Sequence, residues 1–112
     1  MVNISVSYRG IRRKVDSDDC EFGYNDQSWS LISYKGAYSI CHNNRRTDLC
    51  LPSSSVSHRV AVYVDWPAGT LSFYSVSADT LIHLHTFNTT FTQPLYPGFR
   101  LWPRSSVCLC SV

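Results

Sequence analysis

The chain has 112 residues, of which 44% are hydrophobic and 16% charged, and its formal net charge is +2. This length accommodates one domain with a core of its own, and the low charge excludes a disordered tail. A net charge this small also argues against a nucleic-acid binder, because such domains concentrate many Lys and Arg side chains on one face.

The first residues, MVNISVSYRG, lack the basic start and the uninterrupted apolar stretch of a secretory signal. No apolar run approaches the ~18 residues that are needed to cross a bilayer. We therefore expect a cytoplasmic protein without a membrane span. The five cysteines are an odd number, and reduced thiols explain them more simply than a disulfide framework does.

The chain predicts an all-β domain, because short segments rich in β-branched and aromatic residues alternate with turn signals. Hardly any window has the 3.6-residue apolar period of a helix. In chain order, the expected strands are 3–8, 29–34, 37–42, 48–51, 59–65, 71–76, 81–87 and 107–112. Their spacing is typical of an antiparallel sandwich.

Residues 59–76, RVAVYVDWPAGTLSFYSV, have the pattern of a β-hairpin. Valines at alternate positions predict an aliphatic face for its first strand. Pro67 presets φ for a turn, and Gly69 can adopt the positive φ that the return needs. Farther along, Pro94 and Pro97 argue against a central strand in QPLYPGF, where we expect an ordered loop.

Two pairs of metal-ligand residues are two positions apart, His83 with His85 and Cys108 with Cys110. Residues i and i+2 of a strand point to the same side, so each pair permits a site. Neither pair has the Cys-x2-4-Cys signature of a zinc site, and we expect no metal and no other cofactor. The sequence also has no Gly-x-Ser-x-Gly motif and no Gly-rich phosphate loop, so we expect no catalytic residues.

Aromatic and basic residues stand in several expected loops and strand ends. Such side chains recur at the hot spots of protein interfaces. Any one of them taken alone is better explained as a core residue or a solvated charge, whereas the surface as a whole favours binding. They are Arg12, Arg13, Lys14, Tyr34, Tyr38, Arg45, Arg46, Trp66 and Trp102.

Three motifs occur in the order FGYNDQSWSL, RVAVYVDWPAGTLSFYSV and FTQPLYPGF, with SYRGIRRK before them and VCLC after them. Together they resemble the C-terminal part of a SPRY domain, in particular the PRY-SPRY type of fish tripartite-motif proteins, fish NOD-like receptors and stonustoxin-like proteins. The resemblance extends from Ile4 to the end of the chain. It implies a bent antiparallel β-sandwich of SPRY type that recognises proteins without catalysis.

The PRY segment and the first SPRY strands of the family, including a Trp-Glu-Val type strand, are not found before Met1. We therefore expect residues 1–112 to form a single, N-terminally shortened SPRY domain. Such a sandwich would expose strand edges, through which copies could self-associate. RING and B-box modules are not found either, so the ubiquitin-ligase activity of full tripartite-motif proteins does not carry over.

In the family, loops and strand ends on one side of the sandwich bind the target. The matching positions here are the loop 10–14, the side of strand 29–34 that carries Ile32 and Tyr34, and the segment 99–104. Tyr34 and Trp102 would supply an apolar anchor, and the arginines would orient an acidic or carbonyl-rich surface of the partner. The resemblance thus implies partner binding by Arg12, Arg13, Tyr34, Trp102 and Arg104.

The leading hypothesis is a non-catalytic recognition module for an unidentified protein, in innate immunity or in the choice of substrates for a ubiquitin ligase. The alternative is the C-terminal domain of a stonustoxin-like pore-forming protein, in which related sequence lies at the C-terminus. A metal-dependent enzyme built on the two histidines and the cysteines is a third hypothesis.

Overall fold

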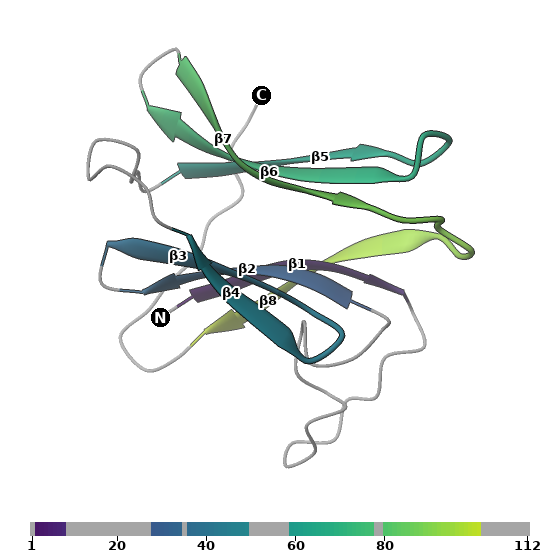
Figure 1. Cartoon of the computed structure of the whole chain (residues 1–112), viewed down its shortest axis with the longest axis horizontal. Helices are drawn as coiled ribbons and strands as arrows, with labels where there is room; N and C mark the ends of the chain where they lie inside the picture. Colours follow the sequence, from purple (N-terminus) through teal and green to yellow (C-terminus); the bar gives the residue numbers. More distant parts are fainter. Residues whose placement is uncertain (1, 9–27, 35, 50–58, 78–79, 102–112) are drawn as a thin grey trace.

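The computed structural model describes residues 2–8, 28–34, 36–49, 59–77 and 80–101, and these residues form strands and turns (Figure 1). Two antiparallel sheets face each other, which confirms the predicted all-β sandwich. No helix in this part of the chain is long and apolar enough to cross a membrane. The strands are β1 Val2–Tyr8, β2 Ser28–Tyr34, β3 Ala37–His42, β4 Arg45–Leu49, β5 Arg59–Asp65, β6 Thr70–Ser77, β7 Thr80–Asn88 and β8 Leu95–Leu101.

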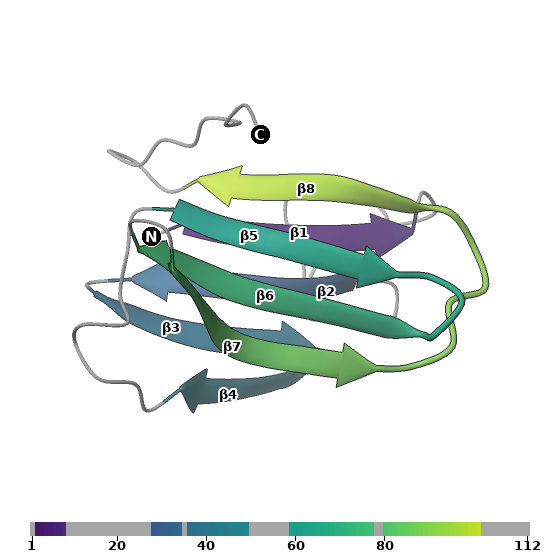
Figure 2. The same cartoon turned by 90° about the horizontal axis from the view of Figure 1, so that it is seen from above.

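The two sheets differ in width. The larger sheet has the order β4-β3-β2-β1-β8, and the smaller sheet has the order β5-β6-β7. Figure 2 shows the smaller sheet above the middle of the larger one, with β8 and β4 as the outer margins on either side. Both margins of the larger sheet therefore extend past the layer that faces them.

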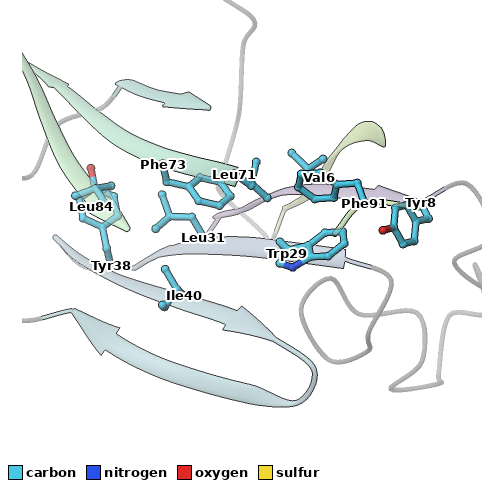
Figure 3. Close-up of a cluster of buried hydrophobic side chains, with 10 residues drawn as sticks. All are labelled: Val6, Tyr8, Trp29, Leu31, Tyr38, Ile40, Leu71, Phe73, Leu84 and Phe91. Carbon is cyan, nitrogen blue, oxygen red and sulfur yellow. The ribbon is translucent and has the colours of Figure 1, made fainter. Parts of the chain in front are cut away.

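The core lies between the sheets and follows from the two-residue period of the strands (Figure 3). Trp29 and Leu31 point inward from β2, and Leu71 and Phe73 meet them from β6. The remaining core residues are Val6, Tyr8, Tyr38, Ile40, Leu84 and Phe91. The outward face of the central strands is also shielded from solvent and carries small residues such as Ser28, Ser30 and Cys41.

The predicted hairpin 59–76 is confirmed as β5 and β6. Gly69 has a φ of 73°, and its N–H donates to the carbonyl of Trp66 at 3.2 Å. The Asp65 carboxylate accepts a hydrogen bond from the N–H of Ala68 at 3.1 Å. The side chain of Asp65 and the glycine thus close the turn from both ends.

The interpretation of QPLYPGF as a loop was wrong, because β8 runs from Leu95 to Leu101 through this motif. Pro97 lies opposite Val6 of β1, and β8 is the edge strand of its sheet. An edge strand has one side without a neighbour, so the N–H that proline lacks need not cost a ladder hydrogen bond. The two prolines excluded a central strand and left an edge strand open.

The strand predicted at 48–51 begins earlier, since β4 starts at Arg45. Asn43 and Asn44 have positive φ values of 53° and 63° and join β3 to β4 in a two-residue turn. Arg45 and Arg46 therefore belong to a strand and not to a loop. The strand expected at 107–112 lies outside the described residues.

Candidate functional site

Tyr34 is the predicted binding residue that the structure describes. It is the last residue of β2, lies opposite Ala37 across the β2–β3 turn, and is 43% exposed. Ile32 shares its side of the strand but is buried. On this side of β2, Tyr34 is therefore the side chain that can reach a partner.

The other four predicted binding residues, Arg12, Arg13, Trp102 and Arg104, lie outside the described residues. Ser33, Val2 and Leu101 form one row across the larger sheet. Tyr34 follows Ser33 in β2, and Leu101 is the last residue of β8, so Tyr34 and the end of β8 lie at the same end of the sheet.

The segment 9–27, which contains Arg12 and Arg13, is attached at the other end of the sheet. It begins after Tyr8 and ends before Ser28, and β1 separates these attachment points from the row of Val2 by about 20 Å. A common surface of the two arginines with Tyr34 stays a prediction.

Trp66 is an exposed aromatic residue that the predicted binding set did not include. Its side chain is 46% exposed at the tip of the β5–β6 hairpin, and its Nε1–H donates to the carbonyl of Gln93 at 3.2 Å. The N–H of Thr92 donates to the hydroxyl of Tyr8 at 3.1 Å, which ties the same loop to β1. The sequence signal was a Trp-Pro pair at a hairpin tip, which does not reveal the partner loop.

His83 and His85 do not form the same-face pair that their spacing permits. The β6–β7 ladder has a register shift between Phe73 and Tyr74, which places His85 opposite Phe73 and His83 opposite Tyr74. Phe73 and Tyr74 are adjacent in β6 and therefore face opposite sides of the sheet. Their partners, His85 and His83, face opposite sides as well. The part of the chain that the structure describes contains no group of three potential metal ligands.

On the outer face of the smaller sheet, three polar side chains form a short hydrogen-bonded chain. The Thr86 hydroxyl lies 2.7 Å from His83 Nε2 and 2.8 Å from the Ser72 hydroxyl. Nucleophilic catalysis also needs a group that orients the histidine. The described carboxylates, Asp48 and Asp65, lie on β4 and β5 and not on this chain of contacts.

The pKa of His85 is lowered from its usual 6.5, first by burial and second by the charge of His83. The unfolded chain therefore binds a proton more readily than the native state just below pH 6.5, and stability falls as the pH falls through this window. We expect the melting temperature to drop between pH 7.5 and 5.5. His85→Gln should make this drop smaller in thermal unfolding, and an unchanged drop would contradict the assignment.

The SPRY domain family model matches residues 2–111 of this chain. Stonustoxin subunit beta of Synanceia horrida is 42% identical over 99 residues, which cover 88% of this chain and 14% of the toxin subunit. Tripartite motif-containing protein 14 of Mus musculus is 38% identical over 99 residues, which cover 88% of this chain and 22% of that protein. The crystal structure of the TRIM65 PSpry domain superposes with a TM-score of 0.76 and 31% identity, covering 90% of this chain and 52% of that one.

The matched region is a small part of the toxin subunit and of the tripartite-motif protein, whose activities belong to the whole proteins. The match itself extends over nearly the whole of the chain and over both sheets. The predicted resemblance is confirmed, and the chain belongs to the SPRY domain family.

Proposed function

We propose that this chain is a non-catalytic module that recognises another protein. The observation that carries the proposal is its membership of the SPRY family, whose domains generally bind proteins. An antiparallel sandwich with exposed aromatic side chains at its strand ends suits such a role, because aromatic residues give much contact area for little conformational entropy. A cytoplasmic location, in innate immunity or substrate selection by a ubiquitin ligase, belongs to the same proposal.

The proposed binding surface consists of Arg12, Arg13, Tyr34, Trp102 and Arg104. Its support is the exposure of Tyr34 and the attachment of the segment 102–104 at the same end of the larger sheet. Tyr34 anchors the partner through its ring, and the arginines hold carboxylates or carbonyls.

Tyr34→Ala is expected to weaken partner binding about tenfold, the effect of losing one interface hot spot of ~1.4 kcal/mol. Proteins captured from cytosol by the wild-type chain are identified, and the affinity of a purified partner is then measured by calorimetry. Tyr63→Ala is the matched control, because Tyr63 is 67% exposed on β5 of the other sheet. Loss of binding in the control and not in Tyr34→Ala would reject the surface, and the lack of any saturable partner would reject the function.

A piece of a cytolytic toxin is the second candidate, favoured by the 42% identity to stonustoxin subunit beta. Relatives of both kinds cover the same 88% of the chain, so coverage favours neither context. Sequencing the transcript around this segment distinguishes them. An upstream region related to the toxin subunits would support the second candidate, and tripartite-motif modules would exclude it.

A further inference from the structure

The β4 margin of the larger sheet carries a cationic residue on its inner side. His42 lies opposite Arg45 in the β3–β4 ladder, and Ile40 lies opposite Thr47. Residues directly opposite each other share a face, so Arg45 and Thr47 face the same side as the core residue Ile40. Both are exposed, because β4 extends beyond β7 of the smaller sheet (Figure 2).

The two sheets meet beside this margin through aromatic rings. His42 stacks on Trp29 at a centroid distance of 4.7 Å and contacts the edge of Phe87 in β7 at 6.0 Å. Phe87 in turn contacts His85 at 4.6 Å. We call the set His42, Arg45, His85 and Phe87 the β4 ledge; its three rings are half-buried, and its arginine is exposed.

The charge of the β4 ledge is uncompensated within the described part of the chain. Asp48 lies on the opposite face of β4, where it accepts a hydrogen bond from Ser39 at 2.6 Å and pairs with Arg46 at 3.6 Å. Asp65, the other described carboxylate, stands at the far end of β5. Arg45 forms no ion pair with a described residue, so the ledge is a cationic rim around an apolar ring.

We propose that the β4 ledge binds an acidic segment of a partner protein, with a Glu or Asp carboxylate on the Arg45 guanidinium and an apolar contact on Phe87. This inference rests on the proposed function and gives the chemistry of the partner. A carboxylate can accept two parallel hydrogen bonds from the planar guanidinium of arginine. Without a partner, the exposed Arg45 side chain is solvated. The β6–β7 ladder has a register shift next to the ledge, and bulges of this kind oppose strand addition, so we expect side chains to hold the segment.

His85 makes this binding dependent on pH. His42 Nδ1 lies 2.6 Å from the carbonyl of Ser28, so this nitrogen donates there and does not face the bound carboxylate. The lowered pKa of His85, caused by burial and by His83 on the other face, is opposed when a carboxylate binds. Protonation of His85 adds positive charge to the ledge beside the Arg45 guanidinium, so affinity should rise as the pH falls from 7.5 to 5.5.

The test uses a dye-labelled peptide of six glutamates and measures its affinity by fluorescence anisotropy at low ionic strength. Arg45→Ala should weaken binding about fivefold, and Arg46→Ala less than about twofold. The two variants lose the same charge from adjacent positions of one strand, but Arg46 lies on the opposite face and is already paired with Asp48. A second measurement at pH 5.5 should show tighter binding by the wild-type chain.

Equal losses in Arg45→Ala and Arg46→Ala would overturn the proposal, since the peptide would then sense only the net charge. Equal binding of a six-lysine peptide would overturn it as well. Both substitutions replace exposed side chains, and thermal unfolding shows whether each variant keeps its fold. The peptide needs no natural partner, so this assay can fail while Tyr34-dependent partner binding succeeds, and the two failures are distinguishable.

Discussion

Replacing Gly69 with alanine is expected to destabilise the domain by about 3 kcal/mol or more. A Cβ atom at this position would overlap with the backbone carbonyl oxygen of Thr89, which cannot move aside as a flexible side chain does. The N–H of Thr89 also donates to the carbonyl of Gly69 at 2.8 Å. A shift of Thr89 away from Gly69 that makes room for the Cβ atom would therefore break this hydrogen bond. The positive φ of 73° adds strain of its own.

Gly36→Ala provides the matched control for this substitution. Gly36 has nearly the same φ, 75°, but an added Cβ would meet no atom within 4 Å. Alanine at Gly36 should therefore cost only the strain of the left-handed conformation, about 1 kcal/mol. Urea unfolding measures the loss in free energy of unfolding for each variant. Equal losses would show that the close approach of Thr89 to Gly69 does not restrict the residue at this position.

Much of the fold could be predicted because strand periodicity and turn chemistry act locally. Trp29 and Leu31 alternate with small residues, and this pattern marks the inner side of β2 wherever the strand is placed. Pro67 and Gly69 specify a turn through their own φ preferences. Neither feature needs knowledge of distant residues; the strand 29–34 and the turn were predicted, and both are confirmed.

The errors concern features that depend on neighbours in the sheet. Pro97 is compatible with a strand only because β8 is at an edge, which a local pattern does not show. The register shift at Phe73 and Tyr74 depends on how β6 pairs with β7, and it separates His83 from His85. The sequence predicted how residues alternate along a strand, and it did not predict which strands are neighbours or in what register they pair.

The degree to which the β5 valines are buried could not be predicted from a local pattern either. The valines of β5 alternate as predicted, yet Val62 and Val64 are 37% and 39% exposed. They lie opposite Phe73 and Leu71, both fully buried, and so face the core side of the smaller sheet. Periodicity indicates which side a residue faces, whereas its coverage depends on its place in the sheet, and β5 is an edge strand of the smaller sheet.

Among the candidate binding residues, some could be predicted from one segment and others depend on neighbours in the fold. Tyr34 was found from a motif match, and its exposure is a property of a strand end that a single segment can predict. The β4 ledge combines His42, Arg45, His85 and Phe87 from three strands and two sheets, with 45 residues of separation between the first and the last. The registers within each sheet and the packing of the two sheets together bring these residues side by side, so the ledge could not be predicted from spacing.

Trp29→Ala is expected to cost about 3–5 kcal/mol, a large share of the stability of a domain of this size. The ring is 2% exposed and contacts Tyr8 and Phe91 edge-on, each at 5.3 Å, so its removal leaves a cavity between β1, β2 and the loop after β7.

Trp66→Ala is the control, because Trp66 also contacts Phe91, at 6.3 Å, but is 46% exposed. It should lose about 1–2 kcal/mol, from one hydrogen bond and partial burial. Because both variants lose the same side chain and the same neighbour, the difference in their free energies of unfolding measures how far burial, and not residue type, stabilises the sandwich. Similar losses in urea unfolding would mean that the loop 89–94, held by Trp66 through Gln93, contributes as much as the core beneath it.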